Sequence, residues 1–373
     1  MDVISGIREK NTIKVLDLIM RHGEISRVEL AHSMDLTKAT ISDIVANLIE
    51  KGLVREKRTV ISGLGRPQTM LEMVEDVFHV VGIGVMRDRI EGCLINAQGR
   101  ILEQTSRSLR EDSSGENIFD NLFSIVDELN KDINAISIGI PGPLDVENGI
   151  VKKPPKFPDF ENINLTKILS ERYDVNVWIE NDSDVAAFGE KWYGDGRQLD
   201  DFIYLFVDKG IGAGIIKDGN IYHGKSGYAG EIGHLLLPVE DDFKYLEDIC
   251  GIDVIIQKAK ENSSGREMTI QEIGKRYISG DEKICDLVDE MERYIGIALV
   301  SIIHMFGITD IFVGGKAVYL GDKFLSNVKE FVEKYLFYKH DISVRFSNLG
   351  DLAMPMGAAV HGIRNYLSKT ILV

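Results

Sequence analysis

The 373-residue sequence predicts a two-part α/β protein, in which a small helical module with a β-hairpin precedes a two-lobed α/β body. Three observations predict this organisation. Apolar residues recur at helical spacing up to about residue 50, and short apolar strands alternate with helices after about residue 78. The chain is also too long for one compact hydrophobic core, so two or three domains are expected.

The first two helices are predicted from their apolar spacing and their end signals. Apolar residues recur at helical spacing from Ile13 to Ile19, and Gly23 ends the pattern. Ser26 and Glu29 form a capping-box pattern, which starts a second, short helix that ends near residue 35. A tight turn then leads into a third helix.

The third helix is predicted to begin after Thr37, because threonine is a good N-terminal cap. Four apolar residues form one stripe along it: Ile41, Ile44, Val45 and Leu48. The other residues at its start are short and polar, as close approach to a DNA major groove requires: Thr37, Lys38, Ala39, Thr40, Ser42 and Asp43. Asp43 fits either a contact to cytosine or a local helix cap.

A β-hairpin is predicted to follow this helix, with one strand from Leu53 to Val60 and a return strand from about Gln68. The Gly-Arg-Pro core at its tip suits an extended backbone that lays Arg66 along a minor groove. Helix order, short turn and basic hairpin together predict a winged helix-turn-helix DNA-binding domain over residues 1–70. The alternative is a small three-helix module for protein contacts.

The net charge of −16 is distributed unevenly along the chain. Residues 1–70 carry 11 Lys and Arg against 9 Asp and Glu, whereas the remaining residues carry 32 against 50. An acidic body is repelled by nucleic acid, so any DNA contact is expected in the N-terminal module.

The sequence also predicts the compartment. Three widely spaced cysteines indicate a reducing environment, and the N-terminus lacks the apolar stretch of a signal peptide. The longest apolar stretch, residues 295–308, is too short for a membrane span and is expected to form a buried core helix. A cytoplasmic protein without membrane contact is therefore expected.

The body opens with two predicted strands, His79–Val85 and Ile90–Ile95, that form a β-hairpin. Helices and strands alternate after it, which is typical of actin-like ATPase folds. Four short motifs follow in order: Gly139-Ile140-Pro141-Gly142-Pro143, Glu180-Asn181-Asp182, Gly210-Ile211-Gly212-Ala213-Gly214 and Gly230-Glu231-Ile232-Gly233-His234.

On these motifs the chain resembles the ROK family (repressors, open reading frames and kinases), specifically its winged-helix repressor branch, from about residue 10 onward. The resemblance implies an actin-like ATPase body of the ribonuclease H-like, hexokinase type. It implies a first α/β lobe over residues 71–182, completed by a C-terminal helix at about 352–373. The second lobe, residues 183–351, is then expected to hold the sugar site and the oligomer contacts.

The family's sugar contacts correspond to five residues of this chain: Asn181, Asp182, Glu231, His234 and Glu247. Their chemistry suits a polyol, since carboxylates accept hydrogen bonds from paired hydroxyls while Asn and His both donate and accept. In kinase members the residue at Asp182 is the catalytic base that takes a proton from the attacking hydroxyl. Taken singly, each of these residues could instead be a surface polar group or a helix cap.

The nucleotide motifs depart from the family pattern. Kinase members carry Asp-x-Gly-Gly-Thr in the first hairpin, where this chain has Gly84 at the Asp and Met86-Arg87-Asp88 at Gly-Gly-Thr. These changes remove a carboxylate, add bulk and bring an acid to a phosphate cradle, so nucleotide binding is expected to be lost. A second loop keeps its glycines as a degenerate nucleotide site, or uses them only for a tight turn: Gly210, Gly212 and Gly214.

The family's structural zinc site is also predicted to be absent. It uses the His of Gly-Glu-x-Gly-His with three cysteines just before a sugar-binding Glu, but no cysteine lies between His234 and Glu247 here. One imidazole and the later Cys250 do not make a tetrahedral site. No metal and no cofactor are expected, and ATP with magnesium is expected only if kinase activity is retained.

The sequence thus predicts a sugar-responsive transcriptional regulator, a repressor of carbohydrate-metabolism genes. Its expected partners are operator DNA, a monosaccharide or small oligosaccharide such as glucose, N-acetylglucosamine or xylose, and further copies of itself in a homodimer or homotetramer. One alternative is an ATP-dependent sugar kinase, of the glucokinase or N-acetylglucosamine kinase type, with a regulatory DNA-binding head. Another is a metabolic scaffold or sensor that does not bind DNA.

Overall fold

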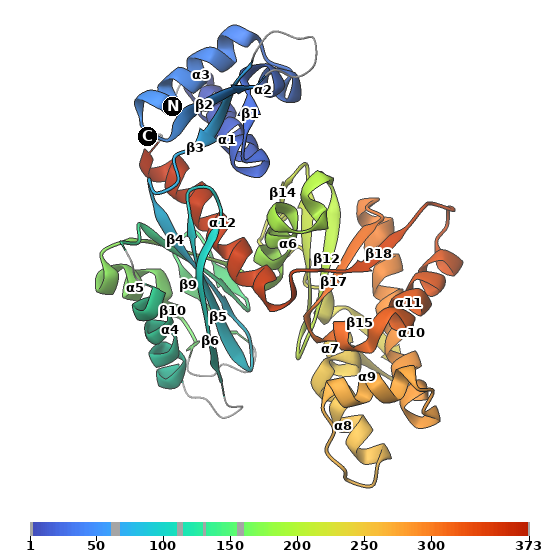
Figure 1. Cartoon of the computed structure of the whole chain (residues 1–373). Coiled ribbons are helices and arrows are strands. Elements are labelled where there is room, and N and C mark those ends of the chain that lie inside the picture. The colour runs from blue at the N-terminus through green and yellow to red at the C-terminus, as the bar shows by residue number, and fades with distance from the viewer. Residues whose placement is uncertain (1–2, 61–67, 110–114, 130–131, 155–159, 372–373) are drawn as a thin grey trace. The chain divides into compact units, whose positions relative to one another are not determined.

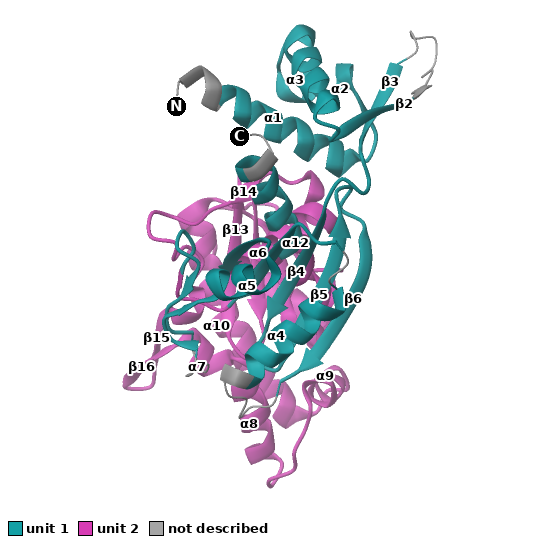
Figure 2. Ribbon diagram, turned by 90° about the vertical axis from the view of Figure 1, so that its left-hand side faces the viewer, with its two compact units in different colours: residues 1–140, 145–180, 358–373 teal, residues 141–144, 181–357 magenta. Residues whose placement is uncertain are grey.

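A computed structural model describes residues 3–60, 68–109, 115–129, 132–154 and 160–371. Their contacts divide the chain into two compact units (Figure 2). Unit 1 comprises residues 1–140, 145–180 and 358–373, and unit 2 comprises residues 141–144 and 181–357. The domain boundaries given above stay predictions.

Three helices open the chain: α1 (Val3–His22), α2 (Arg27–Met34) and α3 (Lys38–Glu50) (Figure 1). The predicted capping box of α2 is confirmed, because Glu29 N donates to Ser26 Oγ at 3.2 Å and Ser26 N donates to Glu29 Oε2 at 2.8 Å. All four residues of the predicted α3 stripe are buried. Leu16 and Ile19 of α1 and Leu30 of α2 are buried as well, and α2 packs against α3.

The predicted hairpin is present as β2 (Val54–Val60) and β3 (Gln68–Met73). A strand that the sequence did not predict, β1 (Ile25–Ser26), pairs with β3 and gives the sheet order β1-β3-β2. Two residues are too short to show an alternating pattern, so no sequence signal marks β1. Arg66 and the rest of the hairpin tip lie outside the described residues.

Unit 1 contains a five-stranded sheet of order β11-β7-β4-β5-β6. Its strands are β4 (His79–Val85), β5 (Arg89–Asn96), β6 (Ile101–Ser108), β7 (Ala135–Ile140) and β11 (Asn176–Asn181). Helix α4 (Gly115–Leu129) packs on β5 and β6, and α5 (Leu165–Tyr173) follows the small sheet of β8 (Leu144–Asp145), β9 (Ile150–Val151) and β10 (Ile163–Asn164).

Unit 2 repeats this strand arrangement in a sheet of order β14-β13-β12-β17-β18. Its strands are β12 (Phe202–Val207), β13 (Ile211–Lys217), β14 (Asn220–Ile221), β17 (Asp310–Gly314) and β18 (Ser343–Phe346). As with β4, the central strand β12 pairs antiparallel with the next strand and parallel with a later one. The motif Gly210–Gly214 was predicted as a loop, but the chain is already in β13 from Ile211 onward.

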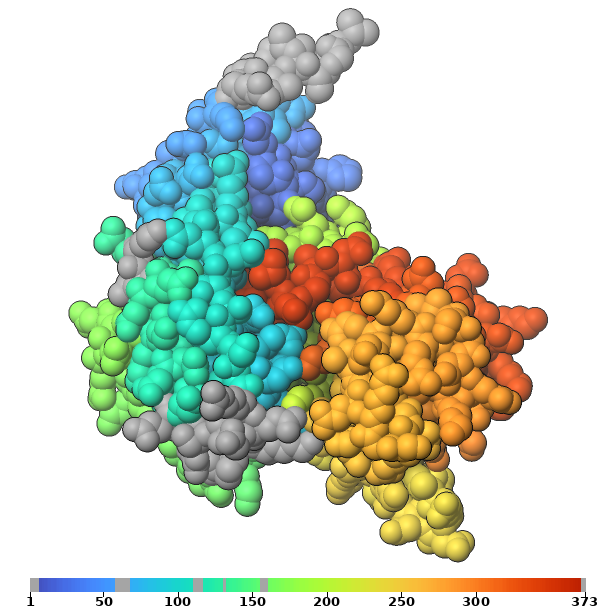
Figure 3. Space-filling model, turned by 60° about the horizontal axis from the view of Figure 1, so that its bottom comes forward, coloured from blue at the N-terminus to red at the C-terminus, as the bar shows by residue number. Residues whose placement is uncertain are grey.

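The helices of unit 2 are α6 (Asp182–Tyr193), α7 (Leu246–Cys250), α8 (Ile252–Asn262), α9 (Ile270–Ile278), α10 (Glu282–Phe306) and α11 (Gly321–Tyr335). The predicted core helix over residues 295–308 is confirmed as the second half of α10, except that the helix ends at Phe306. Helix α10 packs against α7, α8, α9 and α11. The segment of α8 and the turn after it projects from the rest of this unit (Figure 3). No helix in the described ranges has the length and apolar character needed to cross a membrane.

Helix α12 (Ala353–Tyr366) starts in unit 2 and continues into unit 1. Within unit 2 its first turn crosses α6 with the two backbones in direct contact. A Cβ placed on Gly189 would lie 2.1 Å from the Ala353 carbonyl oxygen, and one on Gly357 would lie 1.7 Å from the Val185 carbonyl oxygen. Only glycine permits such an approach at these two positions.

Candidate functional site

Strand β13 is the platform on which the predicted sugar residues are assembled. A Cβ on Gly212 would lie 2.2 Å from Ser183 Oγ, and one on Gly214 would lie 2.2 Å from the Ser183 carbonyl oxygen. These two glycines therefore let the first turn of α6 lie directly on the strand. Gly210 lies instead in the β12–β13 turn, where its carbonyl oxygen accepts a hydrogen bond from Asp208 N at 2.9 Å.

The segment that carries Glu231 and His234 also lies against β13. Gly230 has a φ of +87°, and a Cβ there would lie 1.8 Å from the Ala213 carbonyl oxygen. A Cβ on Gly233 would lie 2.1 Å from the Ile211 carbonyl oxygen. These two glycines thus hold Glu231, which lies between them, and His234, which follows the second, close to the strand.

Asn181 and Asp182 occupy the start of α6. Asn181 is the N-cap, and its Oδ1 accepts hydrogen bonds from Ser183 N at 3.0 Å and Asp184 N at 3.4 Å. Asp182 Oδ1 accepts from Ser183 N at 2.8 Å. These hydrogen bonds orient the Asn181 amide so that its Oδ1 faces the helix. Its donor atom, Nδ2, lies 3.4 Å from the position that a Cβ on Gly142 would occupy.

Gly142 marks the point at which these groups meet. The same Cβ position on Gly142 lies 3.7 Å from Glu231 Oε1, so Asn181 and Glu231 approach one point from two sides. His234 Nδ1 lies 3.4 Å from Glu231 Oε2. An amide, a carboxylate and an imidazole thereby line one surface within unit 2.

Glu247, the fifth predicted sugar residue, is placed by a β-hairpin. Strands β15 (Leu236–Val239) and β16 (Asp242–Tyr245) form four pairs, and Leu246 N donates to the Leu235 carbonyl oxygen at 3.0 Å beyond them. The hairpin brings the Tyr245 ring to 5.3 Å from the ring of His234. It also places Glu247 Oε2 at 3.5 Å from the Cβ position of Gly233, so Glu247 joins the group.

All five predicted sugar residues therefore lie in unit 2, in three short segments around β13. The side chains of Glu231 and His234 are 38% and 47% exposed, so a ligand can reach them from solvent. Three carboxylates, an amide and an imidazole offer acceptors and donors in the mixture that vicinal hydroxyls require. The sequence predicted the residue types and marked Gly142 as part of the Gly139–Pro143 motif, but it did not predict that these groups meet there.

The residues at the position of the family's zinc site do not fit a structural zinc ion. In the segment where cysteine ligands are expected the chain forms the β15–β16 hairpin, which contains none. Cys250 is buried in the hydrophobic core of unit 2, and this burial raises the pKa of its thiol above the ordinary value. Such a thiol disfavours the thiolate that binds zinc. Strand pairing and the buried side chains of Leu237 and Leu246 hold this loop instead.

In unit 1, the turn between β4 and β5 holds the residues predicted to depart from the phosphate motif, Met86, Arg87 and Asp88. Met86 N donates to the Arg89 carbonyl oxygen at 2.9 Å, which closes the turn, and the Met86 side chain is buried. Arg89 forms ion pairs with Asp88 at 2.8 Å and with Glu91 at 3.4 Å.

The predicted DNA-reading residues lie at the start of α3. Thr37 caps the helix, because its Oγ1 accepts a hydrogen bond from Thr40 N at 3.1 Å, and the two hydroxyl oxygens lie 2.9 Å apart. Thr40 is half-buried. The remaining residues of the predicted set are exposed: Lys38, Ala39, Ser42 and Asp43.

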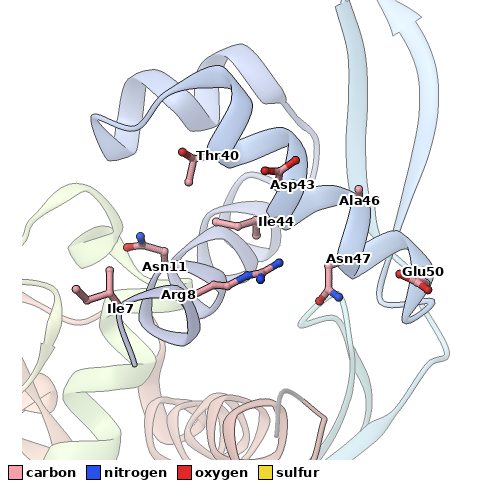
Figure 4. A pocket seen from close by; sticks show the side chains of 9 residues that line it. All are labelled: Ile7, Arg8, Asn11, Thr40, Asp43, Ile44, Ala46, Asn47 and Glu50. Atoms are coloured by element: carbon pink, nitrogen blue, oxygen red, sulfur yellow. The ribbon is translucent and has the colours of Figure 1, made fainter. Parts of the chain in front are cut away.

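A groove of about 580 Å³ separates the N-terminal half of α1 from α3. Figure 4 shows Arg8 and Asn11 on α1 below the side chains of Thr40 and Asp43 on α3. Six α3 residues line it: Thr40, Asp43, Ile44, Ala46, Asn47 and Glu50. Sequence reasoning missed Arg8 and Asn11, since only the packing of α1 beside α3 brings them to the reading helix.

Comparison with known proteins agrees with this architecture. A family model described as the ROK family matches residues 80–363, and one described as winged helix-turn-helix DNA-binding matches residues 8–55. The chain is 28% identical to the xylose repressor of Caldicellulosiruptor bescii over 97% of each chain. It is 26% identical to the DNA-binding transcriptional repressor Mlc of Escherichia coli, over 96% of this chain and 94% of the relative.

Among solved structures, a ROK family transcriptional regulator described as a homolog of the E. coli MLC protein covers 98% of both chains. It has a TM-score of 0.80 and 23% sequence identity, and therefore shows the fold alone. The predicted fold class, an N-terminal winged helix-turn-helix followed by two mixed-sheet lobes, is confirmed.

Proposed function

The chain belongs to the ROK family and carries an N-terminal winged helix-turn-helix, and from this premise we propose that it is a sugar-responsive transcriptional repressor of carbohydrate-metabolism genes. It acts in the cytoplasm as a homodimer or homotetramer on operator DNA. The relatives named as a xylose repressor and as a transcriptional repressor support this assignment. A dimer suits the role because two linked reading helices can bind two half-sites at a fixed spacing.

The observation that carries the sugar response is the assembly of polar groups around Gly142. Asn181 Nδ2 and Glu231 Oε1 approach one point, and His234 and Glu247 lie beside it. A pentose or hexose presents neighbouring hydroxyls that need this mixture of acceptors and donors. The sugar changes DNA affinity only if it binds the DNA-competent and DNA-incompetent arrangements unequally.

The first experiment measures DNA binding directly. Fluorescence anisotropy with upstream DNA and a panel of monosaccharides is expected to show a specific complex whose affinity one sugar changes. A Gly142→Ala variant is the sharpest probe of the site, because its Cβ fits at ordinary contact distance of 3.4 and 3.7 Å yet fills the meeting point. We expect it to melt at an unchanged temperature and to bind the sugar at least about 10-fold more weakly, a loss of roughly 1.4 kcal/mol.

One contrary result would reject the sugar site. If Gly142→Ala binds every effective sugar as tightly as the unaltered protein, the ligand does not occupy the space beside Asn181 and Glu231. If no sequence-specific DNA complex forms at moderate salt, the regulatory function itself is wrong.

A second candidate, ATP-dependent sugar kinase, is favoured by Asp182, which lies next to Asn181 at the edge of the same site. It is opposed by the turn at Met86–Arg89, in which the Met86 side chain is buried and Arg89 forms ion pairs with Asp88 and Glu91. We propose that the phosphate motif is lost and that Gly212 and Gly214 are kept for packing. A coupled assay with hexoses, amino sugars, ATP and magnesium is expected to show no turnover. Turnover that Asp182→Asn abolishes would establish the kinase instead.

A further inference from the structure

The outward face of α3 has an unusual composition for a helix that approaches DNA. Opposite the buried stripe, four exposed residues follow one another at spacings of four, three and four: Ala39, Asp43, Ala46 and Glu50. This spacing places them on one line along the helix. On this line the carboxylate of Asp43 therefore lies between the methyl groups of Ala39 and Ala46.

Asp43 is not a helix cap. It is the sixth residue of α3, and Thr37 already caps the helix through the Thr40 amide. Within the described part of the chain, no hydrogen bond or ion pair to the Asp43 carboxylate is found. Its neighbours one turn away along the helix are Ala39, Thr40, Ala46 and Asn47, none of which is a cation. The local role that the sequence left open is thus excluded.

Arg8 lines the same groove, but among the described residues no ion pair joins it to Asp43. An unpaired carboxylate at this place is compatible with DNA only next to a hydrogen-bond donor. It is repelled by phosphates, and it can only accept hydrogen bonds. In the major groove, guanine presents two acceptors and thymine one acceptor with a methyl group. Adenine presents its N6 donor beside the N7 acceptor, which repels a carboxylate. Cytosine N4 has an acceptor, guanine O6, on one side only and the C5–H group on the other, so cytosine is the base that an aspartate reads best.

We propose that Asp43 is a specificity-determining residue that accepts a hydrogen bond from a cytosine N4 in each operator half-site. An aspartate side chain is short, so the helix backbone must lie deep in the groove for its oxygens to reach a base edge. Ala39 and Ala46, on the same line and one turn to either side, leave room for this approach. The proposal rests on the proposed DNA-binding function and adds a C·G pair at one fixed position of the half-site.

The test is selection of duplexes from a random library by the full-length protein, followed by affinity measurements on the selected sites. The unaltered protein is expected to select C·G at one position, and replacing that pair should weaken binding by about 5- to 150-fold. Asp43→Asn is expected to change the preference at that position to A·T, since asparagine pairs with adenine N6 and N7, and to keep the other positions. Asp43→Ala should lose the preference at that position alone.

Glu50→Gln is the matched control, because it removes the same charge from the same face. Glu50 lies seven residues further along α3, roughly 10 Å beyond Asp43, and its replacement should leave the selected sequence unchanged.

Two results would overturn the proposal. In the first, Asp43→Asn and the unaltered protein select the same sequence. In the second, Asp43→Asn binds all sequences more tightly without a change of preference, which would place Asp43 opposite a phosphate. If the unaltered protein enriches no sequence at all, the proposed DNA-binding function is wrong, and the proposed contact between Asp43 and cytosine is wrong with it.

Discussion

The buried cluster around Glu292 predicts that the stability of unit 2 depends on pH. Glu292 lies in α10 and is 5% exposed. Its Oε1 accepts a hydrogen bond from the Tyr277 hydroxyl, and its Oε2 accepts one from Asn327 Nδ2 at 3.0 Å. Burial raises the pKa of the Glu292 carboxyl from 4.5 to about 7, despite these donors and the nearby Lys323, and Asp289 adds to the increase.

The sign of the effect follows from the proton count. Between pH 4.5 and about 7 the folded protein holds a proton on Glu292 that the unfolded chain has released, so the free energy of unfolding falls as pH rises through this window. Above pH 7 both states are ionised and the loss is complete. At about 1.4 kcal/mol per pKa unit, the shift corresponds to about 3 kcal/mol, and solvent screening reduces the expected change to about 2 kcal/mol.

The perturbation is Glu292→Gln, whose amide imitates the protonated carboxyl at every pH. Urea unfolding at pH 5, 6, 7 and 8 can follow Trp192 of α6 in a Trp178→Phe background, because these are the two tryptophans of the chain. The variant should gain about 2 kcal/mol relative to the unaltered protein between pH 5 and 8. Glu290→Gln serves as control, since Glu290 is 43% exposed and pairs with Lys258 at the surface. A difference between Glu292→Gln and the unaltered protein that stays constant over this pH range would refute the reasoning.

Three further predictions concern the sugar site and its supports. Leu237→Ala should lower the free energy of unfolding by about 2–4 kcal/mol and weaken sugar binding, because it loosens the β15–β16 hairpin. Leu236→Ala, at an exposed neighbouring residue, should change neither the free energy of unfolding in a denaturant titration nor the affinity in a sugar titration. Incubation with EDTA should leave the melting temperature and the sugar affinity unchanged, because the hairpin contains no cysteine ligands; a fall in either would show that a metal holds the loop. Gly357→Ala should lower the melting temperature through a loss of about 3 kcal/mol, because its Cβ would overlap the Val185 carbonyl oxygen, and an unchanged melting temperature would contradict this packing.

The winged helix-turn-helix was predictable because its signals are local. The capping box at Ser26–Glu29 and the cap at Thr37 act within four residues, and the apolar stripe of α3 reflects the helical period. Strand β1 was not predictable, since two residues become a strand only by pairing with β3, more than forty residues away in the sequence.

The sugar residues were identified by residue type, but their arrangement depends on contacts that no local pattern records. Gly212 and Gly214 were assigned to a loop because glycines in a short run usually indicate a turn. In the structure they serve the contact between β13 and α6, which Ser183 completes. The hairpin that places Glu247 was likewise visible in the sequence only as a loop without cysteines.

The glycine crossing of α6 and α12 limits how the region next to the sugar residues can deform. Helices separated by side chains can slide by exchanging rotamers, but Gly189 and Gly357 leave no such layer here. At this crossing the backbones of α6 and α12 are in direct contact, so a shift of one helix requires a shift of the other. A ligand that displaces the N-terminal turn of α6 would therefore displace the first turn of α12 by a similar distance, because no deformable side-chain layer separates the two helices.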